Sequence, residues 1–386
     1  MISLQNRRVL QNIEKIKTEL SATTPYLLEE FLTTEHDIDG HYNIHIQMLK
    51  YCPMGCPGCY QEELSSKEHI QIDKIKEYVI NILEKVKPET YKLTFFGGEP
   101  LLRISSIFEI LKWVKGFNNT ESTLKEICMP TSGTTGLKAD YGLTLKNNID
   151  KFIEYAIDLD VKLSISVSHD GPNNLVHRNI EDYKINDLNY YIKEKEEHYN
   201  LKILPTYISC VIPQNIDEDY FTDTFLYFLD HLGKPGTFTI PHILDKTGNL
   251  FKEPIIFRNS INKFISRYYG THYWEMAPKI FKDMESKFKH KHKFNWCGAG
   301  LNHSALTPEG IKDCEYIKGS GPVLLNKMDQ YCNKCEIKDY CQRPCLKNME
   351  VETDNFLAQC KLRKIIFNEL SKAIHNPNSN TNSKTN

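Results

Sequence analysis

Six apolar, strand-like runs alternate with helical segments between residues 38 and 245 of this chain. In the helical segments apolar residues recur three or four positions apart, as they do from Ile75 to Val86 after Asp73, which we expect to cap its helix. Strands that alternate with helices form parallel β/α units. We therefore expect an α/β fold, a partial (β/α)6 barrel of the TIM type over residues 38–245. The predicted strands are 41–49, 91–96, 126–131, 161–167, 201–211 and 237–243.

The rest of the chain divides by pattern. Residues 1–37 have amphipathic, helical periodicity and are expected to form an N-terminal helical extension. Residues 246–290 are predicted to be a helical linker, and their many aromatic residues are expected to lie in a core. Residues 291–365 contain many cysteines and turn residues, so we expect a small domain held together by metal. Residues 366–386 are expected to be the end of a helix followed by a disordered tail rich in Asn, Ser and Thr.

Composition and charge limit the possible partners. The 386 residues are 40% hydrophobic and 25% charged, with a formal net charge of -2. This balance gives no electrostatic basis for binding nucleic acid or an anionic membrane. No apolar run reaches the roughly 20 residues of a membrane span, and the N-terminus is polar, without a secretory signal. We therefore expect a cytoplasmic protein.

The cysteines are unevenly distributed. Three of the 12 lie between residues 52 and 59, seven lie between 297 and 360, and Cys128 and Cys210 are isolated. Without an export signal, so many cysteines favour metal or redox chemistry over disulfides. Cys128 falls within a predicted strand and is expected to be a small core residue.

The three N-terminal cysteines, Cys52, Cys56 and Cys59, follow the first predicted strand in a C-x3-C-x2-C spacing. Three thiolates can hold three corners of a four-iron, four-sulfur cluster and leave the fourth iron without a protein ligand. An open iron can bind another molecule and pass an electron to it.

This loop resembles the signature of the radical S-adenosylmethionine (SAM) superfamily, and Gly97-Gly98-Glu99-Pro100 after the second strand resembles its GGEP motif. The C-terminal cysteines from Cys332 to Cys360 resemble a SPASM domain, an auxiliary-cluster domain whose opening segment corresponds to Cys297–Gly300 and Thr307–Gly310. The resemblance implies a cluster that, when reduced, cleaves SAM to a 5′-deoxyadenosyl radical able to abstract hydrogen from carbon.

The resemblance also implies which residues contact SAM. The two glycines would let the backbone approach its methionine part, and the glutamate would accept a hydrogen bond from its amino group. A serine and an arginine after the fourth strand would lie near the ribose and the carboxylate. The aromatic that relatives have before the third cysteine is a glycine here, so the adenine contact would pass to the tyrosine after it. The predicted SAM-binding residues are Tyr60, Gly97, Gly98, Glu99, Pro100, Ser168 and Arg178.

For the C-terminal cysteines the resemblance implies two auxiliary four-iron clusters. One would be held by Cys332, Cys335, Cys341 and Cys360, and the other by Cys297, Cys314 and Cys345. The fourth ligand of the second cluster stays open between substrate and a distant side chain such as His290, His292 or Cys210. A zinc site at Cys332–Cys345 is an alternative, but it leaves the other three cysteines of this region unexplained.

Relatives with this domain architecture mostly modify peptides or proteins. We expect an enzyme, a radical SAM oxidoreductase that acts as a peptide maturase on a ribosomally made peptide and forms a thioether or carbon crosslink. It would need an electron donor such as flavodoxin or ferredoxin, and a separate leader-binding protein or its own barrel surface to recognise the peptide. One alternative is an anaerobic sulfatase-maturing enzyme, in which Glu315 after Cys314 would act as general base. An alternative of another class is a non-enzymatic metal-binding structural protein.

Overall fold

The computed structural model describes residues 40–375 except for the short segments 57–58, 60–65, 118–120, 134–142, 175–177, 179–181, 200–207, 233–235, 242–243, 290–302, 315–316 and 342–344. The predicted N-terminal extension and C-terminal tail lie outside this range. The chain divides into two units, one of residues 1–168, 183–207 and 297–325, the other of residues 169–182, 208–296 and 326–386. None of the described helices combines the length and apolar character that a membrane span requires.

The first unit is built on a parallel sheet. Its strands are β1 (His41–Gln47), β2 (Thr90–Phe96), β3 (Thr123–Thr131), β4 (Lys162–Ser168) and β7 (His303–Thr307). They lie in the order β4-β3-β2-β1-β7, all parallel, and β8 (Gly310–Lys312) pairs antiparallel with β7. The α/β class with parallel strands is therefore confirmed. The strand β7 next to β1 was not predicted, because its sequence was assigned to the C-terminal domain.

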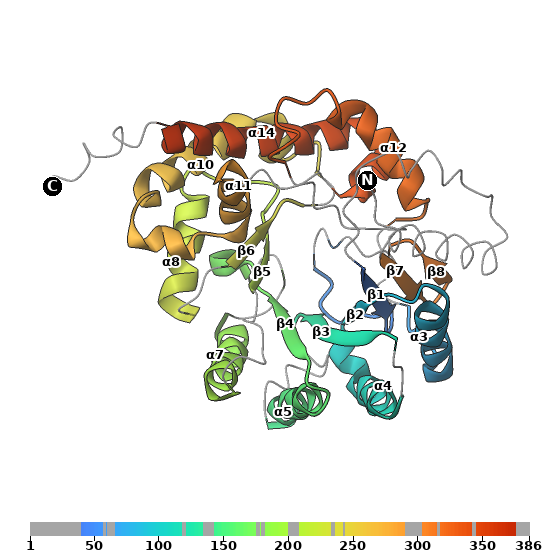
Figure 1. Ribbon diagram of the computed structural model, residues 1–386. Helices are drawn as coiled ribbons and strands as arrows, with labels where there is room; N and C mark the ends of the chain where they lie inside the picture. Colours follow the sequence, from blue (N-terminus) through green and yellow to red (C-terminus); the bar gives the residue numbers. More distant parts are fainter. Residues whose placement is uncertain are drawn as a thin grey trace. The chain divides into compact units, whose positions relative to one another are not determined.

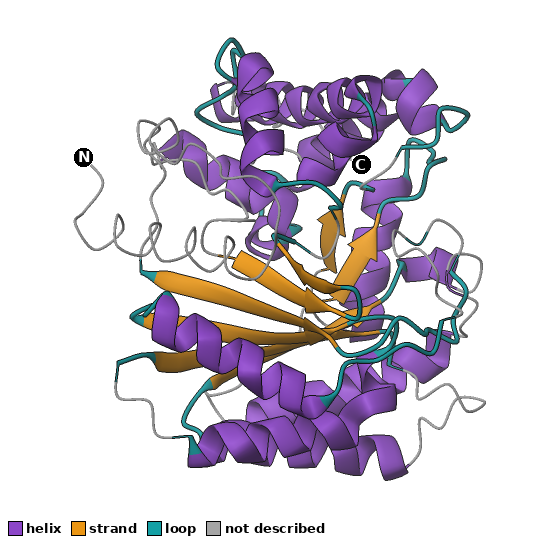
Figure 2. Ribbon diagram, turned by 90° about the vertical axis from the view of Figure 1, so that its right-hand side faces the viewer, coloured by secondary structure: helices purple, strands orange, loops and turns teal. Residues whose placement is uncertain are grey.

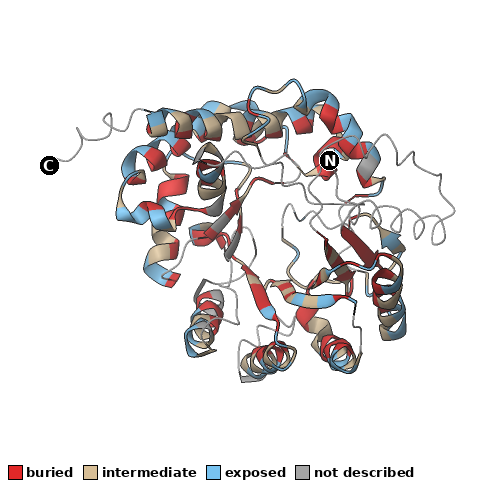
Figure 3. Ribbon diagram, viewed as in Figure 1, coloured by how far each residue is buried: buried red, intermediate tan, exposed pale blue. Residues whose placement is uncertain are grey.

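Helices α3 (Ile72–Lys85), α4 (Ile104–Gly116) and α5 (Leu143–Asp158) connect β1 to β4 and cover one face of the sheet, and α7 (Asp182–Tyr199) follows β4 (Figures 1 and 2). Tyr42, Ile44 and Ile46 of β1 alternate as buried residues, and the apolar stripe of α3 is buried as well (Figure 3). The expected cap of α3 is wrong: Gln71 is the N-cap, with no side-chain hydrogen bond. Asp73 lies in the first turn, where its charge favours the helix dipole.

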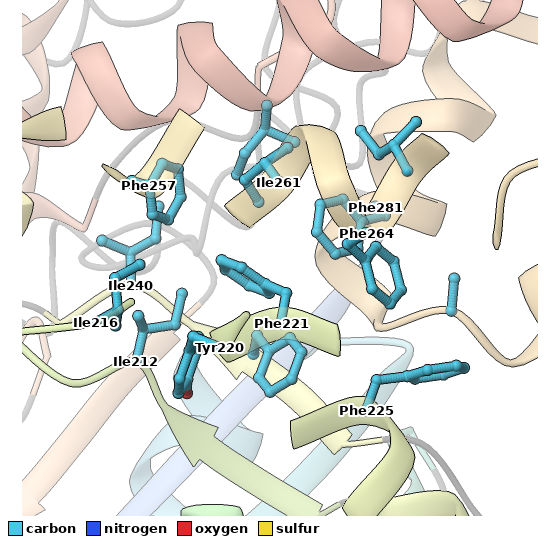
Figure 4. Packing of buried hydrophobic residues seen from close by; sticks show 14 of the residues in the cluster. Ile212, Ile216, Tyr220, Phe221, Phe225, Ile240, Phe257, Ile261, Phe264 and Phe281 are labelled. Carbon is cyan, nitrogen blue, oxygen red and sulfur yellow. The ribbon is translucent and has the colours of Figure 1, made fainter. Parts of the chain in front are cut away.

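The second unit contains the parallel pair β5 (Ile208–Val211) and β6 (Gly236–Thr239), followed by helices. Phe221, Phe257, Phe264 and Phe281 are fully buried in its core and their rings converge in Figure 4. The expected linker thus supplies much of this core, and the expected boundary at 365/366 falls inside the last helix. The helices are α8 (Tyr220–Leu232), α9 (Asn249–Lys252), α10 (Pro254–Tyr268), α11 (Lys279–Lys289), α12 (Gly321–Cys332, shared with the first unit), α13 (Leu346–Val351) and α14 (Thr353–His375), with the 3-10 turns η2 (Gly171–Asn173) and η3 (His272–Met276).

Candidate functional site: the cysteine loop and its surroundings

The cysteine loop follows the carboxyl end of β1. Cys52 and Cys56 are partly buried, Cys59 is exposed, and the Cys59 amide donates to the Cys56 carbonyl at 3.2 Å. Burial raises the pKa of the Cys52 thiol to about 12, and negative charge on Glu99, Cys56 and Cys59 acts in the same direction. The charges of Glu99, Cys56 and Cys59 are therefore close enough to affect the Cys52 thiol. Because iron binds the thiolate, cluster assembly has to deprotonate a thiol whose pKa is raised.

The glycines after β2 pack directly against the backbone of the cysteine loop. The Gly98 amide donates to the Leu49 carbonyl at 2.9 Å, and the Glu99 amide donates to the Tyr51 carbonyl at 3.0 Å. A Cβ atom would lie 2.3 Å from the Leu49 oxygen at Gly97, where φ is +144°, and 2.0 Å from the Tyr51 oxygen at Gly98. Only glycine fits such an approach. The sequence argument assigned the glycines to cofactor contact, but the fold already requires them to hold this loop.

Glu99 is completely buried and its carboxylate accepts four hydrogen bonds from the chain. Oε1 accepts from the Leu101 amide at 3.0 Å and from the Thr131 hydroxyl at 2.6 Å. Oε2 accepts from the amide and the hydroxyl of Ser132, at 2.8 and 2.5 Å. Burial raises the pKa of Glu99, and these four donors oppose the rise.

A carboxylate offers about four acceptor positions, so these contacts use its capacity. Glu99 therefore joins the segment after β2 to the end of β3, and Pro100 begins the 3-10 turn η1 (Pro100–Arg103) beside it. The hydrogen bond that Glu99 is expected to accept from the SAM amino group would have to displace one of these donors. Sequence reasoning assigned Thr131 and Ser132 no role in the site. Two hydroxyl side chains at a strand end are the signal that could have indicated their role.

Ser168 is the last residue of β4 and is partly exposed. Shortly after it, in the second unit, Arg178 forms a two-pronged ion pair with the buried Asp170: Nε lies 2.8 Å from Oδ2 and Nη2 donates to Oδ1 at 3.0 Å. Oδ1 also accepts from the Val211 amide at 3.0 Å. Arg178, expected to pair with the SAM carboxylate, thus already has a carboxylate partner in the chain.

Four C-terminal cysteines come together in the second unit. Burial raises the pKa of Cys360 to about 12, Arg363 opposes the rise, and Cys341, Cys332 and Cys335 add to it. These are the four that the sequence argument grouped into one cluster. Cys345 is partly buried at the start of α13, whereas Cys314 is buried in the first unit after β8.

Within the described residues, no three His, Cys, Asp or Glu side chains are close enough to hold one metal ion. A four-iron cluster binds each cysteine at a different iron, which spreads the sulfurs further apart than a single ion does. Cysteines that lie in one region, but too far apart to bind a single ion, are therefore compatible with a cluster.

Three predicted site residues, Tyr60, Cys297 and Glu315, lie outside the described residues. Of the distant ligands considered for the second auxiliary cluster, His290 and His292 also lie outside. Cys210 is fully buried in the core of the second unit, 3.5 Å from the Tyr220 hydroxyl, which suits a packing role.

Comparison with known proteins agrees with this arrangement. Residues 39–162, which contain the cysteine loop and Gly97–Pro100, match the family model of a 4Fe-4S single cluster domain. The radical SAM cyclopropyl synthase TigE of Paramaledivibacter caminithermalis is 23% identical over 378 residues, which cover 85% of this chain and 73% of TigE.

Among solved structures, anSMEcpe with bound AdoMet superposes with a TM-score of 0.62 at 15% identity, covering 86% of this chain and 98% of that one. The same enzyme with AdoMet and the Cp18Cys peptide gives 0.60 at 15% identity, covering 89% and 99%. This likeness confirms an α/β fold with the parallel sheet typical of a partial radical SAM barrel. Together with the sequence matches and the cysteine loop, it makes the chain similar to the radical SAM enzyme TigE in sequence and to anSMEcpe in fold.

Proposed function

We propose that this chain is a radical SAM enzyme that oxidatively modifies a peptide, with a ribosomally made peptide as substrate and a thioether or carbon crosslink as product. The observation that carries the proposal is the double backbone contact between the cysteine loop and Gly98-Glu99 at the carboxyl ends of β1 and β2. Parallel α/β folds bind ligands at these strand ends. That anSMEcpe was solved with a bound peptide supports a peptide substrate.

The residues present fit the expected cofactors. Cys52, Cys56 and Cys59 supply three thiolates, one fewer than the four irons of a cluster, so SAM can occupy the remaining iron. When bound, the reduced cluster supplies the electron that cleaves SAM to a 5′-deoxyadenosyl radical. The chain's part is to hold SAM in place and keep water away.

For SAM binding we assign the main chain of Gly97–Pro100 to the amino group, because the acceptor sites of the Glu99 side chain are filled. Ser168 and Tyr60 are kept as contacts to the ribose and adenine. Arg178 would reach the SAM carboxylate only by sharing its guanidinium with Asp170.

For the C-terminal region we propose two auxiliary clusters, one on Cys332, Cys335, Cys341 and Cys360 and one on Cys297, Cys314 and Cys345. The gathering of the first four thiols supports the first assignment. These clusters would carry off the electron that remains after substrate oxidation. A separate electron donor such as flavodoxin or ferredoxin would reduce the SAM cluster. Peptide recognition would use a leader-binding partner or the surface of the barrel, and Glu315 is the proposed base.

The first test is SAM cleavage by anaerobically reconstituted, reduced protein. Three clusters give about twelve irons per chain. The triple variant Cys52→Ala/Cys56→Ala/Cys59→Ala should retain about eight and form no 5′-deoxyadenosine. Cleavage that persists in this variant refutes the assignment of the loop, and a wild-type protein that never cleaves SAM would instead be a metal-binding structural protein.

The second test identifies the substrate. The chain is co-expressed anaerobically with any short peptide or sulfatase that a neighbouring reading frame encodes, and the product is analysed by mass spectrometry. A loss of two hydrogens supports a crosslink. Conversion of a sulfatase Cys or Ser to an aldehyde would support formylglycine formation instead.

A further inference from the structure

The two ends of the cysteine loop are joined by contacts of Leu49 and Lys50, and Lys50 makes most of them. Leu49 and His69 form an antiparallel bridge, and the Lys50 amide donates to the Glu68 carbonyl at 3.1 Å. The side chain repeats the connection, since Lys50 Nζ lies 3.1 Å from Glu68 Oε2. The loop that carries Cys52 to Cys59 is thus closed at its base by main-chain and side-chain contacts of the same residue.

The same ammonium group also binds a second segment. Lys50 Nζ forms an ion pair with Oε1 of Glu309, in the turn between β7 and β8. Glu309 Oε2 accepts from the Thr307 hydroxyl at 2.8 Å and lies 3.2 Å from Lys312 Nζ. Because β7 lies parallel beside β1, Lys50 and Glu309 both follow the carboxyl ends of neighbouring strands.

Burial makes these contacts specific. The Lys50 side chain is only 10% exposed, compared with 62% for Glu68 and 41% for Glu309. Removing an ammonium group from water is costly unless carboxylates and hydrogen bonds replace the water. The two ammonium groups, of Lys50 and Lys312, and the two carboxylates, of Glu68 and Glu309, give this group no net charge. Both carboxylates contact Lys50 and hold it at this position. Lys312, whose side chain is 31% exposed, contacts only Glu309 of this group.

We propose that Lys50 is a positioning residue that sets the cysteine loop against the β7–β8 hairpin. The hairpin leads directly to Cys314, so Lys50 connects the segment with the SAM-cluster cysteines to a segment with a proposed auxiliary-cluster cysteine. Lys50 acts on both segments through the elements that it holds together. The catalytic meaning of this connection rests on the proposed function, but the connection itself does not.

Hydrogen exchange of the cluster-free chain tests the connection. Lys50→Met keeps the aliphatic stem and removes the charge, and Glu309→Gln removes the partner charge while keeping Lys50. In both variants we expect amide exchange to accelerate on the order of tenfold in two places at once. One is the base of the cysteine loop, residues 48–52 and 66–70, and the other is the β7–β8 hairpin, residues 303–312. Lys312→Met is the matched control: it removes the other lysine of Glu309, and we expect exchange at 48–52 and 66–70 to stay as in the wild type.

Acceleration in only one of the two segments, or the same pattern in the Lys312→Met control, would overturn the proposal. Circular dichroism of each variant identifies global unfolding, and if Lys50→Met unfolds, Glu309→Gln supplies the result. In reconstituted protein, the EPR spectrum of the reduced SAM cluster should change in Lys50→Met and not in Lys312→Met.

The two proposals fail in different ways. If the wild type binds no cluster and cleaves no SAM, the proposed function is wrong while the exchange result stands. If the wild type cleaves SAM but Lys50→Met changes neither exchange nor EPR spectrum, only the positioning role is wrong.

Discussion

Replacing Glu99 by glutamine tests the role of this buried carboxylate with almost no change in shape. A glutamine has one acceptor oxygen and one NH2 donor, whereas Glu99 faces backbone amides on both oxygens, from Leu101 and from Ser132. The hydroxyls of Thr131 and Ser132 can rotate to accept from the NH2 group, but a backbone amide cannot. Whichever way the amide turns, one buried N–H faces another donor.

The magnitude follows from these contacts. A buried donor without an acceptor costs about 1–3 kcal/mol, and the remaining hydrogen bonds lose the strength of a charged acceptor, about 1 kcal/mol each. The end of carboxylate desolvation offsets part of this loss. We expect Glu99→Gln to lower the free energy of unfolding by about 2–4 kcal/mol.

The assay is urea unfolding of the cluster-free chain, with amide exchange at residues 101 and 132 as the local measurement. Glu84→Gln, an exposed change on α3, is the control and should stay within about 0.5 kcal/mol of the wild type. If Glu99→Gln weakens SAM binding but leaves stability and exchange unchanged, Glu99 contacts SAM directly and the structural role assigned to it is wrong.

Three other perturbations test the surroundings of the loop. Gly98→Ala would place a Cβ 2.0 Å from a carbonyl oxygen of the cysteine loop. We therefore expect iron loading of the loop to fall and the free energy of unfolding in urea to drop by about 3 kcal/mol. Gly116→Ala is the control and should be neutral in the same assay, because its Cβ meets nothing within 4 Å. Asp170→Asn leaves Arg178 without its buried carboxylate and should cost about 3 kcal/mol in urea unfolding. Burial acts to raise the pKa of Glu309, but hydrogen bonds from its two lysine partners and a threonine lower it to about 2. Its contribution to stability is therefore complete above pH 4.5 and lost as the pH falls towards 2, which acid titration of the cluster-free chain measures against Glu309→Gln.

Two of these changes have further controls. Asp158→Asn breaks an ion pair with Lys115 in which both side chains are about half exposed, and it should cost less than about 1 kcal/mol. An equal loss from Asp158→Asn and Asp170→Asn would contradict the weight given to burial. If the Glu309→Gln protein loses stability between pH 4.5 and 2 as steeply as the wild type, other carboxyl groups cause the loss.

The sequence was most informative where a pattern has one physical cause. Alternating strands and helices predicted the parallel sheet, and the spacing of Cys52, Cys56 and Cys59 predicted their common loop, because both depend on residues close together in the chain. Glu99 shows where this kind of prediction fails. Its charge after a strand suggested ligand binding, but its four hydrogen-bond donors belong to Leu101, Thr131 and Ser132.

The place of β7 beside β1 and the ion pair of Arg178 with Asp170 could not be predicted, for a different reason. Only Ala305 and Leu306 of the five residues of β7 are apolar, so the run carries little strand signal, and its place beside β1 depends on contacts with a strand far earlier in the chain. Arg178 carries no local sign that Asp170 is its partner, since a salt bridge and a ligand contact require the same side chain. The cysteines from Cys332 to Cys360 lie close together in the sequence, so their spacing allowed them to be grouped, and their assignment to a cluster stays a prediction.

The pairing of β7 with β1 has a consequence for biosynthesis. The Tyr42 hydroxyl donates to Ser304, 262 residues later, so one edge of β1 lacks its neighbour until the ribosome has made that distance. At 5–20 residues per second this takes roughly 15–50 seconds. During this interval an open strand edge lies directly before three reactive thiols, a combination that invites pairing with other chains. Nascent chains that stall before residue 303 should therefore be prone to aggregate and depend on chaperones, whereas those that have passed residue 312 should not.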